Sequence, residues 1–209
     1  MISQKKIVLS ALAATIVAFT GCGSSSSDTT TPPPAPTLSS ATLIDAAIQG
    51  LPYTCGTNSS VTDANGTFQF ASGNSCSFTV GTSTLNVAAA KLNANNVKIT
   101  PFDITELAAD TNKTIRFMQL VQSLDKADDG KIDLTALSGK TLVLTTALAD
   151  DSNLATAFTN VVAAGGTTDA ETTLVTAVEA LTHFVSTNTD PTVIEDIPTD
   201  LVVDGWVNP

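Results

Sequence analysis

"TDANGTFQF", residues 62–70, holds the strongest local signal for the fold. The pair Asn65-Gly66 is typical of tight hairpin turns, because both residue types accept the positive φ angles that such turns need. After the turn, Phe68 and Phe70 alternate with polar residues, so both rings are predicted to lie on one face of a strand. The stretch therefore predicts a turn followed by a half-buried β-strand.

The segments around this turn continue the β pattern from about residue 41 to residue 100. Short apolar stretches are separated by turn residues there, as in "TLIDAAIQGL", "CSFTV", "TLNV" and "VKIT". Five or six short strands are expected, and strands of this length and spacing favour a small antiparallel β-sandwich.

After Pro101 the apolar pattern becomes helical. One stripe with the spacing i, i+3, i+4 and i+7 consists of Phe117, Leu120, Val121 and Leu124. Similar stripes lie within residues 152–164 and 174–185. The chain is therefore predicted to be an α+β protein, in which a small N-terminal antiparallel β-sandwich is followed by a helical segment of three or four helices.

Two pairs of residues have the spacing of a capping box, in which the N-cap and N3 side chains bind each other's backbone N–H groups. Asp103 and Glu106 are expected to begin the first helix, and Thr168 and Glu171 a later one.

The expected organisation follows these changes in composition. Strands occupy residues 41–100, and the helical part at residues 101–190 is expected to pack on them. Residues 191–209 are interrupted by prolines and are expected to form an extended tail. Residues 22–40 are rich in Ser, Thr and Pro without apolar periodicity, which predicts a disordered tether.

Residues 1–21 have the parts of a secretory signal. Lys5 and Lys6 supply positive charge, the apolar run "IVLSALAATIVAF" follows, and small residues precede Cys22. The apolar run is shorter than the roughly 20 residues that a membrane-spanning helix needs. The segment is therefore predicted to direct export as a signal peptide.

"FTGC", which ends at Cys22, is either an ordinary cleavage site beside a chance cysteine or a site of lipid attachment. It resembles the lipobox of bacterial lipoproteins, in which the cysteine is diacylated with fatty acids such as palmitate and becomes the mature N-terminus. Phe19 departs from that pattern, which has an aliphatic residue three positions before the cysteine. The resemblance implies a lipid on Cys22, and Gly23 after it implies, by enterobacterial sorting rules, transport to the outer membrane.

If Cys22 carries a lipid, Cys55 and Cys76 are the two cysteines that remain. In an oxidising compartment they are expected to form a disulfide. Closing a loop of about 20 residues would stabilise the fold by roughly 3 kcal/mol in the chain-entropy model. Neither cysteine has a CxxC partner or a nearby histidine, so zinc binding and redox catalysis are disfavoured.

The charge of the chain is strongly negative, with a formal value of −11. The last basic residue is Lys140, and residues 141–209 contain acidic residues that no Lys or Arg balances. Such a surface repels nucleic acid and anionic lipid headgroups. We therefore expect no nucleic-acid partner and a solvated domain outside the cytoplasm.

Four motifs occur in order along the chain, "GLPYTC", "TDANGTFQFASGNSCSFTVG", "IRFMQLVQSLDKADDGKIDL" and "ALTHF". Together they resemble a module near the N-termini of secreted and surface lipoproteins of Gram-negative bacteria. "TDANGTFQF" is also similar to the turn-and-strand signature of carboxypeptidase-regulatory or transthyretin-like sandwiches. The resemblance covers about residues 43–187 and implies a β-sandwich joined to a helical segment at the cell surface. It implies no catalytic residue.

"SLDKADDGKIDL", residues 123–134, is partly similar to an EF-hand calcium loop. The candidate Ca²⁺ ligands are Asp125, Asp128, Asp129 and Asp133. Oxygen ligands at this close spacing, with Gly130 at the bend, suit Ca²⁺. However, Ala127 and Ala136 stand where further ligands are expected. The alternative is an acidic turn between a helix and a strand, with Gly130 in a left-handed conformation.

The sequence contains no nucleophile motif of the GxSxG kind and no phosphate-binding glycine loop. We therefore expect a non-enzymatic, lipid-anchored lipoprotein of the outer membrane or cell surface with a structural, adhesive or assembly role. Its expected partners are the membrane, through the N-terminal lipid, and a protein or a second copy of the chain. No cofactor is expected. The alternative is a Ca²⁺-dependent surface or periplasmic binding protein that uses the loop at 125–133. A third hypothesis, a hydrolase, would need the single histidine, His183, or an acidic pair to act.

Overall fold

The computed structural model describes residues 37–125, 130–167, 173–195, 197–199, 201 and 203. The predicted signal peptide, Cys22 and most of the predicted tether lie outside these residues. The strands are β1 Leu38–Leu43, β2 Ala47–Gln49, β3 Pro52–Cys55, β4 Asn58–Val61, β5 Thr67–Ala71, β6 Cys76–Val80, β7 Ser83–Val87, β8 Val97–Ile99 and β9 Lys131–Asp133. The α-helices are α1 Thr105–Ala108, α2 Thr111–Leu124, α3 Leu144–Ala147, α4 Asp151–Ala163, α5 Ala177–Thr187 and α6 Pro191–Ile194, and two 3₁₀ helices are η1 Pro101–Asp103 and η2 Thr135–Leu137.

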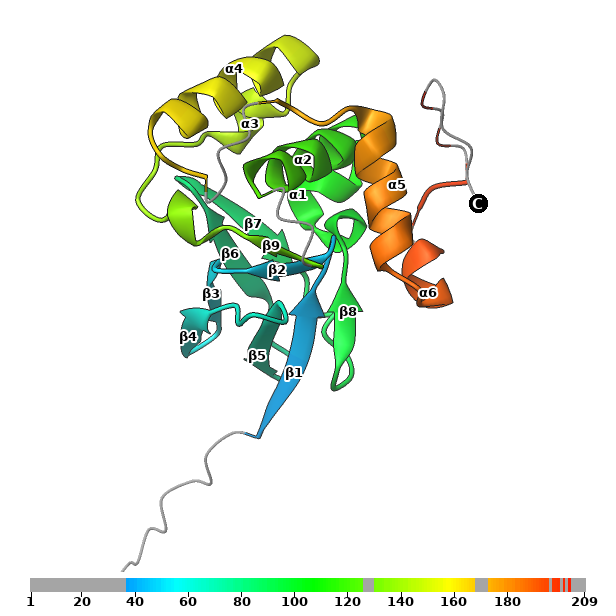
Figure 1. Ribbon diagram of the computed structural model, residues 1–209. Helices are drawn as coiled ribbons and strands as arrows, with labels where there is room; N and C mark the ends of the chain where they lie inside the picture. The colour runs from blue at the N-terminus through cyan, green and yellow to red at the C-terminus, as the bar shows by residue number, and fades with distance from the viewer. Residues whose placement is uncertain are drawn as a thin grey trace, which may run out of the picture. The chain divides into compact units, whose positions relative to one another are not determined.

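The described strands form three small sheets, and helices cover them on one side (Figure 1). The strand orders are β4-β3-β6-β7, β5-β1-β8 and β2-β9. Neighbouring strands are antiparallel except in the pairs β1–β8 and β2–β9, which are parallel. The predicted α+β class with sandwich-like sheets is confirmed, whereas the sequence does not predict the two parallel pairs.

Four aromatic rings join the two larger sheets. Phe68 and Phe70 are buried on one face of β5, as their alternation predicts. Phe68 contacts Phe78 of β6 edge to face, with ring centroids 4.9 Å apart, and Tyr53 of β3 with centroids 5.7 Å apart. Because β5 belongs to one sheet and β3 and β6 to the other, these contacts form the centre of the sandwich.

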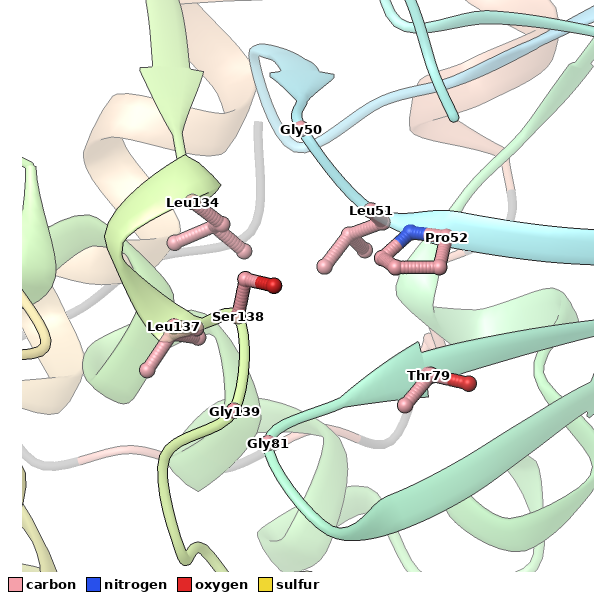
Figure 2. Close-up of a pocket in the computed structure, with 9 residues that line it drawn as sticks. All are labelled: Gly50, Leu51, Pro52, Thr79, Gly81, Leu134, Leu137, Ser138 and Gly139. Atoms are coloured by element: carbon pink, nitrogen blue, oxygen red, sulfur yellow. The ribbon is translucent and has the colours of Figure 1, made fainter. Parts of the chain in front are cut away.

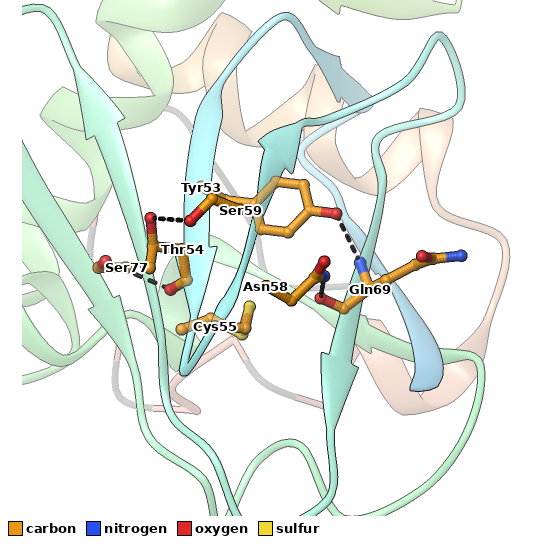
Figure 3. The surroundings of a disulfide bond; sticks show 8 residues. Tyr53, Thr54, Cys55, Asn58, Ser59, Gln69 and Ser77 are labelled. Carbon is orange, nitrogen blue, oxygen red and sulfur yellow. Dashed lines mark hydrogen bonds between the residues drawn. A yellow bond between two sulfur atoms is a disulfide. The ribbon is translucent and has the colours of Figure 1, made fainter. Parts of the chain in front are cut away.

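Cys55 and Cys76 are joined by a disulfide within the sheet β4-β3-β6-β7 (Figure 3). They lie directly opposite each other on β3 and β6, with their Cα atoms 4.2 Å apart, and both are buried. This separation is typical of a non-hydrogen-bonded pair in an antiparallel ladder. The predicted pairing of the two cysteines is therefore confirmed.

Side chains from the disulfide-bonded sheet also cover the open edge of β5 (Figure 3). The N–H of Gln69 donates to the Tyr53 hydroxyl at 3.0 Å, and Asn58 Nδ2 donates to the Gln69 carbonyl at 2.7 Å. Because an unpaired edge is prone to association, these bonds both join the sheets and protect β5.

A turn does form here, closed by the bond from the Gly66 N–H to the Asp63 carbonyl at 2.9 Å, but the hairpin predicted at Asn65-Gly66 is wrong. The turn connects β4 to β5, which lie in different sheets, so the chain crosses the sandwich at this point. The Asp63 carboxylate accepts the N–H groups of Asn65 and Thr67, both at 2.8 Å. Partial burial alone would raise the pKa of Asp63, but these bonds and the Thr67 hydroxyl lower it below its ordinary value of 3.8.

The helices α2 and α4 follow the predicted apolar stripes. The predicted α2 stripe is fully buried, and so are Leu154, Phe158 and Val161 of α4. In Figure 1, α2 lies between α4 and α5, and it packs against both. One cluster of buried side chains includes residues of the larger sheets, α2 and α4, and a second cluster lies between α2, α5 and α6.

The predicted helix starts need correction. Asp103 does not cap a helix with Glu106; its carboxylate instead accepts the N–H of Thr100 at 3.0 Å, at the start of η1. The capping box of α5 is formed by Thr176 and Glu179, with Thr176 N–H donating to Glu179 Oε2 at 2.7 Å. The predicted pair of Thr168 and Glu171 lies outside the described residues.

Three segments differ from the predicted organisation. The strand β1 begins at Leu38, inside the range predicted to be a tether, because its residues pair with β5. The strand β9 lies within the range predicted to be helical and pairs with β2. In the tail predicted to be extended, α6 forms one helical turn, and Val193 and Ile197 are buried in the second cluster. Their burial explains why this segment folds against the body.

We expect Gly66→Ala to destabilise the protein far more than Gly73→Ala. Both glycines have positive φ, 70° and 86°, so each substitution incurs roughly 1–2 kcal/mol of backbone strain. A Cβ at Gly66 would also lie 2.5 Å from Leu43 O and 2.9 Å from Ile48 N, whereas no atom lies within 4 Å of one at Gly73. Urea unfolding should therefore show a loss of roughly 3 kcal/mol or more for Gly66→Ala and about 1 kcal/mol for Gly73→Ala. Equal losses would contradict the close approach of the turn to β1 and β2.

Candidate functional site

The acidic loop predicted from the sequence begins where α2 ends. Asp125 follows the last residue of α2 and is buried, and its Oδ2 accepts the backbone N–H of Asp133. Gly130 has a φ of 81°, the left-handed conformation that the acidic-turn hypothesis predicts. Asp125 thus links the end of α2 to β9.

Asp133 is itself held by two protein donors. Its Oδ1 accepts the N–H of Thr135 at 2.9 Å, and its Oδ2 accepts Nε2 of Gln49 on β2 at 3.0 Å. These bonds support the parallel pairing of β2 with β9. Two of the four candidate ligands, Asp125 and Asp133, are therefore brought together, and both carboxylates stabilise the loop.

The other two candidate ligands, Asp128 and Asp129, lie outside the described residues. Among the residues that the structure describes, no group of three or more His, Cys, Asp or Glu side chains is arranged to hold a metal ion. Calcium binding by this loop stays a prediction.

A shallow cleft of about 150 Å³ lies between the start of β3, the end of β6 and the turn after β9 (Figure 2). Its lining residues are Gly50, Leu51, Pro52, Thr79, Gly81, Leu134, Leu137, Ser138 and Gly139. The hydroxyl of Ser138 points into the cleft opposite Leu51. None of the nine lining residues is an acid, base or thiol, and the cleft is smaller than the roughly 300–1,000 Å³ of usual ligand pockets.

The sequence prediction misses a buried carboxyl group at Asp45. This residue lies in the turn between β1 and β2 and is fully buried. Gln122 Nε2 of α2 donates to its carboxyl group, at 3.0 Å from each oxygen, and also to Ala180 O of α5. An acidic residue inside the apolar stretch "TLIDAAIQGL" is the signal that could have revealed it.

The backbone of Asp45 also binds α5. Its carbonyl accepts the Thr187 hydroxyl at 2.9 Å and Asn188 Nδ2 at 2.8 Å. Asp45 therefore links one strand turn to both α2 and the end of α5. Burial raises the pKa of Asp45 to about 8, and the Gln122 hydrogen bond offsets only part of this shift.

The predicted site residues do not form one site. Cys55 and Cys76 belong to the β3–β6 pair, whereas Asp125 and Asp133 adjoin α2 and β9. His183 is half-buried on α5, in the element that binds Asp45. Within the described ranges, none of the helices combines the length and the apolar character that crossing a bilayer requires.

Comparison with known proteins finds no relative of this chain. No protein family, no curated protein and no solved structure matches this chain.

We expect the stability of the protein to fall as the pH rises from about 4 to 8 because of Asp45. Its pKa is about 8 in the folded state, against an ordinary value of 3.8. The folded state therefore holds a proton that the unfolded state has lost over this window, so each pH unit should lower the free energy of unfolding by roughly 1 kcal/mol. Above pH 8 the loss is complete.

Urea unfolding of the wild type and of Asp45→Asn at pH 5, 6, 7 and 8 measures this effect. The variant keeps a neutral side chain of nearly the same shape, so its stability should change much less over the range. Parallel curves for the two proteins would contradict the assignment of the proton to Asp45.

Proposed function

We propose that this chain is a non-enzymatic lipoprotein, anchored by a lipid on Cys22 to the outer membrane or cell surface, with a structural, adhesive or assembly role. The observation that carries the proposal concerns the three cysteines. Cys55 and Cys76 are joined by a buried disulfide between β3 and β6. Cys22 is thus the one cysteine of the chain outside this bond. It follows an apolar run after Thr20 and Gly21, and it precedes the Ser, Thr and Pro segment.

The position of the first strand supports an anchored domain. β1 begins at Leu38, so residues 23–37 separate it from Cys22. At about 3.4 Å per residue, a segment of this length reaches at most roughly 50 Å. Such a reach is sufficient to hold the folded body clear of lipid headgroups.

The buried disulfide also supports a compartment outside the cytoplasm. Disulfides persist in oxidising environments and are rare in the cytosol. Residues 141–209 carry acidic residues and no Lys or Arg, although Asp151 and Asp190 pair with Arg116 and Lys98 from earlier in the chain. This acidic stretch fits a solvated surface that does not bind anionic headgroups directly. Contact with the membrane would then depend on the lipid alone.

Intact-mass spectrometry of the membrane-extracted protein tests the anchor. The expected species begins at Cys22, carries a diacylglyceryl adduct, and gains about two daltons on reduction as the Cys55–Cys76 bond opens. Cys22→Ser should abolish the adduct and release the protein from the membrane fraction, while the gain on reduction remains. A wild-type protein that is soluble and without lipid would refute the anchor.

The second candidate is a Ca²⁺-dependent surface or periplasmic binding protein. The observation that favours it is the meeting of Asp125 with Asp133 around a loop bent at Gly130. Carboxylate oxygens are the ligands that Ca²⁺ prefers. A bound ion would strengthen the link between the end of α2 and β9.

For this candidate we expect millimolar Ca²⁺, and not Mg²⁺, to raise the thermal midpoint of the wild type by a few degrees. Asp125→Asn should abolish the rise, because it removes a charge from the loop but keeps an oxygen that can accept the N–H of Asp133. Asp110→Asn, at the other end of α2, is the matched control and should keep the rise. An unchanged midpoint for the wild type would show that the loop is an ordinary acidic turn.

A further inference from the structure

The strand β7 is an edge strand, and other segments cover both of its ends. At its start, the Ser83 hydroxyl donates to Leu142 O at 3.0 Å and accepts the N–H of Leu144 at 2.8 Å. Near its end, the Glu106 carboxylate accepts the backbone N–H of Asn86 at 2.7 Å and also binds the Asn86 side chain. A carboxylate here takes the place that a neighbouring strand would occupy.

Between these two covers, the backbone N–H and C=O of one residue remain open. The N–H of Asn86 points away from β6 toward Glu106, and in a strand the residue two positions earlier points the same way. The N–H and C=O of Thr84 therefore face the outer edge of β7. Among the described residues, no side chain or backbone group bonds to this N–H or C=O, and Thr84 is exposed.

An apolar pocket of about 180 Å³ lies directly beside this open position. It is lined by Ser83, Thr84, Leu85, Glu106, Leu107, Lys113, Leu144, Thr145 and Leu148. Its four leucines are buried and form an apolar wall. The volume is below the roughly 300–1,000 Å³ that whole small-molecule ligands occupy, so the pocket suits one apolar side chain.

The pocket lining offers one cation for a ligand carboxylate, Lys113, beside the acidic Glu106. Lys113 is the only cationic side chain among the nine lining residues. Its ammonium lies 3.8 Å from Asp110 Oδ2, and it is 41% exposed. A solvated pair at this distance contributes little free energy, so Lys113 can turn toward a ligand at small cost. The Glu106 carboxylate is already held by Asn86.

We propose that this pocket, together with the open edge at Thr84, binds the C-terminal end of an extended peptide of a partner protein. The peptide backbone would add to β7 at Thr84, its last apolar side chain would fill the leucine pocket, and its terminal carboxylate would pair with Lys113. Backbone pairing with specificity from an adjacent side-chain pocket is a common mode of peptide recognition. Because Glu106 and residues 142–144 cover the rest of the edge, a chain end fits better than an internal segment. The site does not depend on the proposed lipid anchor.

The test uses the full chain, ¹⁵N-labelled and purified in detergent, with the N-acetylated pentapeptide Thr-Ser-Val-Thr-Leu carrying a free C-terminal carboxylate. We expect millimolar peptide to shift the amide signals of Thr84 and Leu85. The same peptide with a C-terminal amide should bind about tenfold more weakly, the effect of losing one charge pair. Lys113→Gln should remove this difference between the two peptides.

A second variant tests the pocket itself. Thr145→Trp places a large ring at the exposed rim and should reduce the affinity at least tenfold, whereas Thr159→Trp on the exposed face of α4 is the matched control and should leave it unchanged. Unfolding midpoints equal to that of the wild type would establish that both variants fold.

Several results would overturn the proposal. These are no shift at millimolar peptide, shifts that avoid Thr84, equal affinity for the acid and the amide, or full binding by Thr145→Trp. Isovalerate binding as tightly as the peptide would instead assign the pocket to small carboxylates. A shift of Thr84 with protein concentration alone would assign it to a second copy of the chain.

Discussion

The contact of Phe68 with Tyr53 and Phe78 is the interaction on which the fold most depends. It places a ring of one sheet against rings of the other, at the centre of the main buried cluster. Each such aromatic pair contributes about 0.5–1.5 kcal/mol beyond the area that it buries. The Tyr53 hydroxyl also binds the edge of β5, so the same side chain fills the core and satisfies a backbone group. The position of β3 and β6, and thus of the disulfide, follows from this packing.

The helices are attached to the strands by buried hydrogen bonds and not by aromatic contacts such as those between the sheets. Asp45, Gln122 and Asn188 connect one strand turn with α2 and the end of α5, and all three are buried. Buried polar groups are tolerated only when they are hydrogen-bonded, and then they favour one arrangement over its competitors. This link therefore helps to orient α5, because the apolar contacts between α5 and α2 are less directional.

The acidic residues of the candidate site could be predicted from local sequence, but the tertiary contacts of buried or edge-covering acids could not. The acidic loop with Gly130 at its bend is a local pattern, because its residues are close in the chain. Glu106 was expected to cap a helix, yet it covers the edge of β7 beside Asn86. Asp45 carried no motif at all. The roles of both acids depend on partners far away in the sequence, which periodicity and spacing do not reveal.

By itself the sequence determined the α+β class, the burial of Phe68 and Phe70 on one face, and the apolar stripe of α2. These features follow from the repeat of a strand or a helix, which neighbouring residues set. Only the tertiary structure decided that the turn at Gly66 crosses between sheets and that β2 pairs with β9. A turn residue permits a change of direction but does not choose the partner strand. That choice depends on which pairing buries the apolar faces and at the same time provides hydrogen-bond partners for the edge groups.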